Sequence, residues 1–284
     1  MDPILQVIAQ VGIFAGVFTS MLAMGISVDF DQIRESLRNP RLLALALVAN
    51  FIAVPLIALV ITRLLPLTTE GRTAVILLGA TAGAPLLPKL ATLSGGRVPF
   101  SIGLMVLLML ATVAYAPLVL PLLLPDVTVL PAEIARSLLV VMLLPLTVGL
   151  IARSRYAAIA DWSADLSRIA GASMAIGLAA GLLVGWEALL ASIGSWIIVA
   201  AILLALAATA IGGLFAAGLD TATQRVAGLG AAMRNVSAAL LIAGRDFGPQ
   251  TLVMTMAATI VLMVTLVILA GELGRRGGGD EVTG

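Results

Sequence analysis

The stretch GAPLLPKLATLSGG, residues 83–96, lies inside a long apolar run and holds Lys89, the only lysine of the chain. The other fifteen cationic side chains are all arginine. Pro85 and Pro88 each lack a backbone N–H and cannot continue a regular helical hydrogen-bond pattern. Gly83, just before them, weakens the helix further. This stretch therefore predicts an interrupted helix that leaves backbone carbonyl groups without intrahelical partners.

The composition places this interruption inside a membrane. Of the 284 residues, 61% are hydrophobic and 11% are charged, and the mean hydropathy is +1.16. Soluble domains are roughly half apolar and about a quarter charged. We therefore expect an all-α polytopic membrane protein, with one membrane domain over residues 1–273 and a short cytoplasmic tail over 274–284. The absence of histidine and cysteine argues against an enzyme or a resident cofactor, and no basic tract points to nucleic acid.

Nine apolar segments are long enough to cross a bilayer, which takes roughly 20 residues per helix. They lie near residues 4–27, 41–64, 73–94, 98–124, 134–152, 167–186, 193–218, 225–244 and 250–272. Ten arginines, among them Arg34 and Arg38, follow odd-numbered segments, and four follow even-numbered ones. Because cytoplasmic loops are enriched in Lys and Arg, we expect a multi-pass protein of the cytoplasmic (inner) membrane, with its N-terminus outside and its C-terminus cytoplasmic.

Two cations remain inside the predicted spans, Lys89 in the third and Arg234 in the eighth. A charge at the bilayer centre costs about 2.5–3.5 kcal/mol on insertion scales, so each needs a reason. Lys89 could extend its ammonium to the nearby water interface, and Arg234 could bond loose carbonyls of a neighbouring broken helix. Otherwise two buried cations without acidic partners predict an anionic ligand, which Arg234 would hold through a bidentate contact.

The segment around Arg234, GLGAAMRNVSAAL at residues 228–240, is also rich in small residues and could unwind. It lies five spans after the segment of Lys89, so the two run in opposite directions through the membrane. Paired interruptions of opposite direction are typical of inverted-repeat transporters, whose site lies where two broken helices cross. The sequence therefore predicts a secondary active transporter working by alternating access, and an anion channel stays open as an alternative.

Four stretches together resemble the bile acid:sodium symporter family over nearly the whole chain. They are LAMGISVDFDQI, NPRLLALALVANFIAVPLIAL, PLLPKLATLSGGRVPFSIG and AAMRNVSAALLIA. The resemblance implies a core domain with two crossing broken helices and a panel domain beside it. The core would use the spans within 41–124 and 193–272, and the panel those within 4–27 and 134–186. The implied cargo is a small organic anion, either a carboxylate metabolite or a bile-acid-like molecule.

The sequence departs from this family at the residues that bind sodium in its sodium-coupled members. The family's glutamate and glutamine in the eighth span stand here as Gly230 and Arg234, and its Ser-Asn pair in the third span stands as Leu87-Pro88. We therefore expect weak or no sodium coupling, with Lys89 and Arg234 in place of the ions. A sodium-coupled symporter with a remodelled site stays open, as do a weak sodium site at Asn50 and Asn235 and a proton as coupling ion.

The residues predicted to contact the substrate gather around the two interrupted segments. They are Lys89, Arg234, Asn235, Asn50, Pro85, Pro88, Met233, Ser237 and Thr112. The expected partners are the organic anion and membrane lipid, and the sequence leaves open whether the chain is a monomer or a homodimer.

Overall fold

The computed structural model describes residues 3–28, 39–124, 130–184 and 194–280. These residues form helices and connecting turns, which confirms the all-α prediction for the described chain. One isolated backbone bridge is also present. Arg34 and Arg38, used to predict orientation, lie outside the described residues. The helices are α1 (Pro3–Ser27), α3 (Pro40–Val48), η1 (Ala49–Ala53), α4 (Val54–Leu64), α5 (Thr69–Ala80), α6 (Leu87–Leu93), α7 (Val98–Leu123), α8 (Pro131–Leu138), η2 (Leu139–Leu143), α9 (Leu144–Arg155), η3 (Ala157–Trp162), α10 (Ser163–Val184), α12 (Ile197–Phe215), α13 (Thr221–Ala232), α14 (Val236–Ile242), η4 (Ala243–Phe247) and α15 (Pro249–Asp280).

Six helical segments of the described chain are long and apolar enough to cross a membrane. They are α1, the continuous unit α3–η1–α4, α7, the continuous unit α8–η2–α9, α12 and α15. The predicted third and eighth spans are each divided into two short helices, α5 and α6 in one case and α13 and α14 in the other. The count of nine membrane crossings therefore stays a prediction. Helix α15 continues past residue 272 into the predicted tail as far as Asp280.

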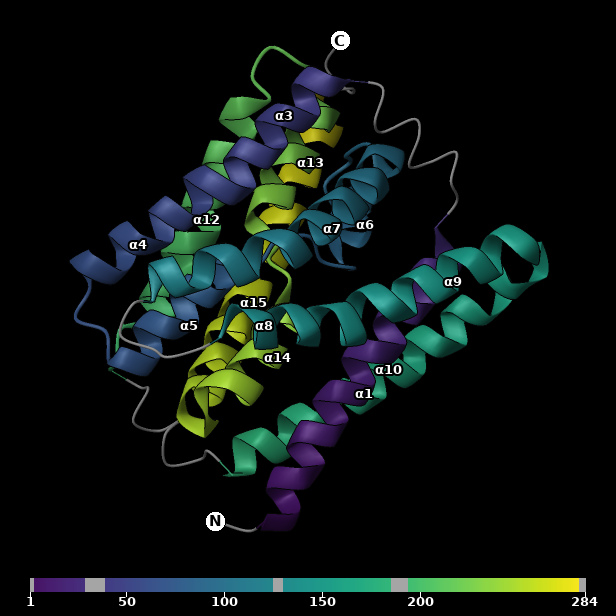
Figure 1. Ribbon diagram of the computed structural model, residues 1–284. Coiled ribbons are helices and arrows are strands. Elements are labelled where there is room, and N and C mark those ends of the chain that lie inside the picture. The colour runs from purple at the N-terminus through teal and green to yellow at the C-terminus, as the bar shows by residue number, and fades with distance from the viewer. Residues whose placement is uncertain (1–2, 29–38, 125–129, 185–193, 281–284) are drawn as a thin grey trace.

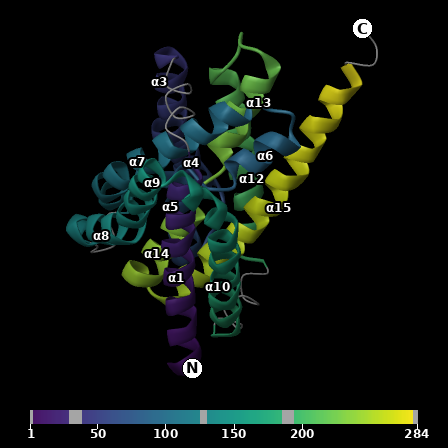
Figure 2. The same ribbon diagram turned by 90° about the vertical axis from the view of Figure 1, so that its right-hand side faces the viewer.

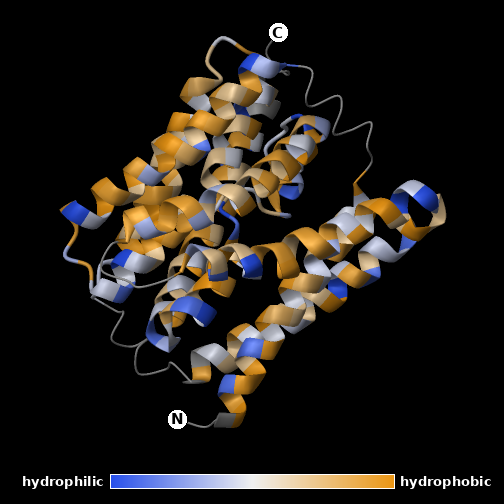
Figure 3. Ribbon diagram, in the orientation of Figure 1, coloured by the Kyte–Doolittle hydropathy of each residue, from blue (hydrophilic) through white to orange (hydrophobic). Residues whose placement is uncertain are grey.

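Hydrophobic residues predominate along most of the helices (Figure 3), and many large apolar side chains are exposed. Leu64 is 76% exposed, Leu118 69% and Leu122 77%. Apolar patches of this extent are unusual on soluble monomers and mark membrane or protein contact surfaces. The surface therefore matches the lipid environment that the composition predicts.

Helices α1, α9 and α10 form one packed group, and the remaining long helices surround the two interrupted segments (Figure 1). Small residues allow the close approach within the first group. A Cβ atom added to Gly12 of α1 would lie 2.7 Å from the Gly177 Cα atom of α10, and one added to Gly149 of α9 would lie 2.9 Å from the Gly25 Cα atom of α1. Helix α1 also contacts α14, α10 contacts α15, and α8 and η2, which continue into α9, contact α7, so the two groups meet along α7, α14 and α15.

The first residues of α1 and the last residues of α15 lie at opposite ends of the molecule in both ribbon views (Figures 1 and 2). This arrangement is compatible with an odd number of crossings, and the sidedness of the two termini stays a prediction.

A π-helical turn interrupts the first long unit after α1, between α3 and α4, and it has a local cause. Pro55 lies in the first turn of α4 and has no N–H to donate to the turn before it. The preceding five residues, η1, widen into a π turn, a form that is frequent at functional sites. Asn50 lies in this turn and is 1% exposed, and its Nδ2 atom donates to the Ala46 carbonyl oxygen at 2.9 Å. Its Oδ1 atom remains available to accept a hydrogen bond from a neighbouring helix.

Candidate functional site

The two interrupted segments meet and cross. Helix α5 ends at Ala80 and α6 begins at Leu87, while α13 ends at Ala232 and α14 begins at Val236. Between these ends, Ala82 and Arg234 form an antiparallel backbone bridge, and the Asn235 N–H donates to the Thr81 carbonyl oxygen at 3.1 Å. The backbone groups freed by the two breaks thus bond to each other, which satisfies them inside the protein as a membrane requires. The segments that the sequence marks as interrupted therefore form one crossing point.

Thr112 of α7 holds the first break in place. Its side chain is fully buried, and its hydroxyl donates to the Ala82 carbonyl oxygen at 2.8 Å and accepts from the Ala82 N–H at 2.9 Å. Both backbone groups of one residue in the break are thus satisfied by one side chain. These contacts show Thr112 as a support of the backbone, and its predicted contact with substrate stays a prediction.

Replacing Thr112 with valine should destabilise the protein by about 1–3 kcal/mol, because it leaves two buried backbone groups of Ala82 without partners. Threonine and valine have nearly the same shape, so the loss reflects hydrogen bonding. The thermal unfolding midpoint of the purified protein measures this effect. Thr112→Ser keeps the hydroxyl and should recover most of the loss. A valine variant as stable as the wild type would contradict this role.

The Arg234 guanidinium lies at the crossing point and is completely buried. Its Nε atom donates to the Leu78 carbonyl oxygen at 2.8 Å, and Nη2 donates to the Gly79 carbonyl oxygen at 2.8 Å. The Nη1 atom donates to Asn50 Oδ1 at 2.9 Å and to the Ala231 carbonyl oxygen at 2.7 Å. Four of the five guanidinium N–H groups are thus hydrogen-bonded. We call this set of four oxygens, from α5, η1 and α13, the oxygen cradle.

These contacts match the structural alternative that the sequence left open for Arg234, in which it bonds loose carbonyls of a broken helix. They also leave one guanidinium N–H group without an acceptor among the described residues, so a bidentate carboxylate contact is not available in this conformation. Its predicted contact with substrate stays untested. The oxygen cradle contains no carboxylate, and among the described residues no three His, Cys, Asp or Glu side chains cluster as a metal site would require.

Gly230, where sodium-coupled relatives are expected to carry a glutamate, lies one turn before Arg234 in a tightly packed part of α13. A Cβ atom added there would lie 2.9 Å from Leu104 Cδ2 and 3.4 Å from Leu87 Cδ2. A carboxylate at this position would enter an apolar surrounding, where an unpaired charge is costly. The side chains around Gly230 are therefore apolar and closely packed, and they leave no room for an ion ligand.

Asn235 is fully buried at the start of α14, and the two N–H groups of its amide are unused among the described residues. Its Oδ1 atom accepts from the Ala238 N–H at 3.0 Å and caps the helix. Its Nδ2 atom is buried and has no partner within the described chain. Buried polar atoms are nearly always satisfied, so an unused donor points to a water or ligand oxygen. Met233, 1% exposed, and Ser237, 8% exposed, flank this position.

The predicted residues of the third span lie farther from the oxygen cradle. Pro88 lies in the first turn of α6, and Pro85 lies in the preceding turn; both are half-buried. Lys89 is exposed and makes no side-chain hydrogen bond or ion pair within the described residues. Arg234 is therefore buried within the protein, whereas Lys89 is accessible at the surface of a short helix, and its predicted contact with substrate stays a prediction.

The structure thus brings Asn50, Arg234, Asn235 and Thr112 to one crossing point, while Lys89 is not part of the oxygen cradle. The carbonyl groups of Leu78, Gly79 and Ala231 were missed by the sequence reasoning. No side-chain signal marks them, since any residue type supplies a carbonyl oxygen. Only Gly83, Pro85 and Pro88 at the first break, and Gly228 and Gly230 before the second, indicate that carbonyl groups are free there.

Comparison with known proteins adds independent information. The sequence profile described as "Sodium Bile acid symporter family" matches residues 14–210. The chain is 24% identical over 246 residues to a probable sodium/metabolite cotransporter BASS2, chloroplastic, of Oryza sativa subsp. japonica, covering 86% of this chain and 59% of that protein. It is 26% identical over 265 residues to a probable sodium/metabolite cotransporter BASS1, chloroplastic, of Arabidopsis thaliana, covering 90% of this chain and 65% of that protein.

The chain spans less than two thirds of the length of either relative. The match to the family profile nevertheless includes α1 from residue 14 onward, the first break, and every described helix from α3 to α10. Together with the six long apolar helices, it identifies a multi-pass membrane protein. The family is one of transporters, which agrees with the expectation that the chain is not an enzyme. On this evidence the chain belongs to the sodium bile acid symporter family.

Proposed function

We propose that this protein is a secondary active transporter that moves a small organic anion across the cytoplasmic membrane by alternating access. In this proposal the Arg234 guanidinium is a fixed cation that takes the place of a coupling sodium ion. One observation carries the proposal: four oxygen atoms from three helical segments surround a buried cationic group at the point where two broken helices cross. A charge held in this way is present at every stage of the transport cycle.

The arrangement of the helices supports transport. The two breaks cross in antiparallel directions, as an inverted repeat of nine crossings would place them. Helices α1 and α10 and the continuous unit α8–η2–α9 form a group that contacts the rest of the bundle along α7, α14 and α15. Motion of the crossing point against this group would expose it alternately to the two sides of the membrane. We assign the N-terminus to the outside because ten arginines follow odd-numbered predicted spans.

The charge at the crossing point supports an anionic cargo. The Arg234 charge is surrounded by neutral oxygen atoms, so it is not cancelled by a carboxylate of the described chain. The free Nδ2 donor of Asn235 lies on the neighbouring residue and would suit a carboxylate oxygen. The names of the plant relatives specify sodium and a metabolite. For this chain we infer a metabolite-like organic anion, with little or no sodium coupling.

We expect uptake of an organic anion by proteoliposomes to proceed equally in sodium and in choline buffer. The reason is that the guanidinium already fills the position that an ion would need. The same comparison can be made on purified protein by thermal unfolding. If the protein had a sodium site, a sodium concentration of 100 times its dissociation constant would raise the free energy of unfolding by about 2.7 kcal/mol. We expect no such increase.

Two results would contradict this assignment. Uptake that requires sodium would favour a sodium-coupled symporter with a remodelled site. A large anion conductance that does not saturate would favour a channel.

A further inference from the structure

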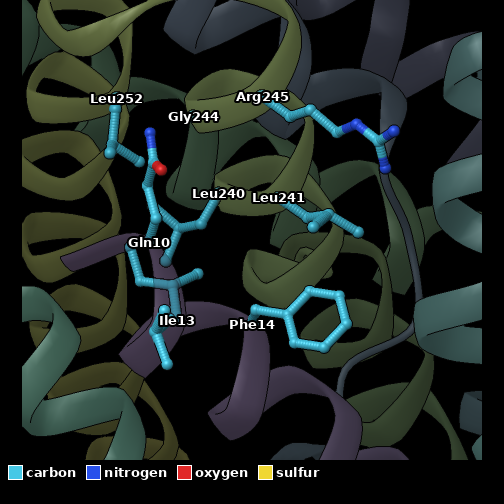
Figure 4. Close-up of a pocket in the computed structure, with 9 residues that line it drawn as sticks. Gln10, Ile13, Phe14, Leu240, Leu241, Gly244, Arg245 and Leu252 are labelled. Atoms are coloured by element: carbon cyan, nitrogen blue, oxygen red, sulfur yellow. The ribbon is translucent and has the colours of Figure 1, made fainter. Parts of the chain in front are cut away.

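Within the described chain, Arg234 has only one N–H group left for an anionic substrate, so that anion needs a second cation. Arg245 lies beside a cavity. A cavity of about 410 Å³ lies between α1 and the segment α14–η4–α15, at the end of the molecule where α1 begins (Figures 1 and 4). Ile13 and Phe14 of α1 and Leu240 and Leu241 of α14 supply most of its apolar wall. The cavity therefore lies where the α1 group meets the crossing helices.

Two polar side chains on this cavity have unused hydrogen-bond donors. Arg245 of η4 is exposed and, within the described chain, forms no salt bridge or hydrogen bond. Gln10 of α1 is also exposed, and its amide makes no hydrogen bond among the described residues. Figure 4 shows the two polar groups on opposite sides of the pocket, with Leu240, Leu241 and Phe14 between them. Free donors at the rim of an apolar cavity suit a ligand that is charged at one end.

We infer that this cavity binds an organic monoanion with a compact apolar body, whose carboxylate pairs with Arg245 and whose body packs on Phe14 and Leu241. Gln10 would donate to a polar group at the far end of the same molecule. This inference rests on the proposed function and deepens it, because it names the cation that receives the anion on one side of the membrane. Ligand sites of this kind are mainly apolar, with a few polar groups that fix the orientation.

The neighbours of Arg245 favour a single negative charge over two. The next residue, Asp246, is half-buried, and its buried Oδ2 atom has no hydrogen-bond donor in the described chain. Glu133 of α8 is close enough to act on Asp246 electrostatically. A ligand with two adjacent carboxylates would place its second charge near these acidic groups and would be repelled. One guanidinium flanked by two carboxyl groups therefore favours ligands with a single carboxylate at this end of the cavity.

The inference can be tested by cysteine labelling, because the natural chain contains no cysteine. Val11 lines the cavity and is 59% exposed, so Val11→Cys should react with a charged maleimide. We expect 2-naphthoate to slow this reaction, whereas neutral 2-naphthamide and naphthalene-2,3-dicarboxylate, whose two carboxylates are adjacent, should protect much less. A cysteine at Gln250, exposed and outside the cavity lining, is the reporter that should not be protected.

Arg245→Gln should raise the concentration of 2-naphthoate needed for protection about tenfold or more, since a charge-assisted hydrogen bond is lost. Arg136→Gln removes one exposed arginine of α8 that does not line the cavity and should leave protection unchanged. Equal protection by naphthoate and naphthamide, or an unchanged Arg245→Gln variant, would overturn the inference. The inference would also be overturned if naphthoate had no effect and the labelling rate changed only when lipid was removed. The cavity would then hold a lipid acyl chain.

The dependence of naphthoate protection on pH is a second measurement. If Arg245 had only a structural role, this dependence would not be expected. Burial raises the pKa of Asp246 to about 6, while Arg245 opposes and Glu133 adds to the increase. The first turn of α15, Pro249 to Thr251, adds no titratable group. As the pH falls through 6, Asp246 becomes neutral, so 2-naphthoate should protect more strongly at pH 5 than at pH 7.5. Asp246→Asn should remove this dependence, and a variant that keeps it would overturn the role of Asp246.

Failure of this inference and failure of the proposed function give different results. If the wild type takes up organic anions and Arg245→Gln does so equally well, the cavity is not the receiving site but the transporter assignment stands. If the wild type takes up no organic anion although naphthoate protects the cavity, the proposed function fails while the binding site stands.

Discussion

Replacing Arg234 with glutamine is expected to lower the stability of the protein by about 3–5 kcal/mol, the usual cost of breaking a buried charged network. The guanidinium donates four hydrogen bonds to oxygens of Leu78, Gly79, Asn50 and Ala231. A glutamine side chain has only two N–H donors and is shorter, so at least two oxygens would be left without donors. The thermal unfolding midpoint in choline buffer measures the loss.

The same variant should become sensitive to sodium, although the wild type is not. Removing the fixed cation leaves an oxygen cradle of three carbonyl groups and one amide oxygen, the type of ligand that hard cations prefer. Sodium should therefore recover part of the lost stability in Arg234→Gln and none in the wild type. Arg234→Lys, which keeps the charge but not the planar fork, should lie between the two in stability and remain insensitive to sodium.

A stable Arg234→Gln protein in choline would show that the cradle does not depend on a cation. A loss of stability without any response to sodium would show that the arginine supports the fold but does not substitute for an ion. Either result would remove the main support for the proposed function.

Replacing Gly83 with alanine should be the second most damaging change, with a loss of at least about 2 kcal/mol from backbone strain and overpacking. Gly83 lies in the first break with a φ of +79°, in the left-handed region that favours glycine. A Cβ atom there would lie 2.5 Å from the Met109 backbone nitrogen and 2.8 Å from the Met105 carbonyl oxygen. Backbone atoms of α7 cannot move aside as a flexible side chain could.

Gly171 provides the matched control for this substitution. It lies inside α10, and a Cβ atom added to it would meet nothing within 4 Å. Gly171→Ala should be neutral or stabilise the helix by up to about 1 kcal/mol. Both variants are compared by thermal unfolding of the purified protein. If Gly83→Ala matched Gly171→Ala, the close approach of α7 to the break would not contribute to the fold.

Much of the architecture could be predicted from the sequence because membrane burial is a local property. The free energy of transferring a segment from water to lipid depends on the residues of that segment alone. The six long apolar helices of the described chain therefore coincide with predicted spans. Pro85 and Pro88 predict the first break for an equally local reason, the loss of backbone donors. The mid-span position of Arg234 predicted that its charge would be buried, and it is.

The partners of these residues could be decided only by the tertiary structure. Arg234 and the Leu78 carbonyl oxygen are 156 positions apart in the sequence, and nothing in either segment specifies the other. Lys89, in an equally apolar context, proved to be exposed because a short helix has two faces and packing decides which one is covered. The role inferred for Arg245 depends on α1 standing opposite η4. The sequence by itself thus determined the long apolar helices and the positions of the two breaks, since apolar character and the loss of backbone donors are properties of single residues. Only the folded bundle decided which charge is held at the crossing point and which stays free, since that depends on contacts between distant segments.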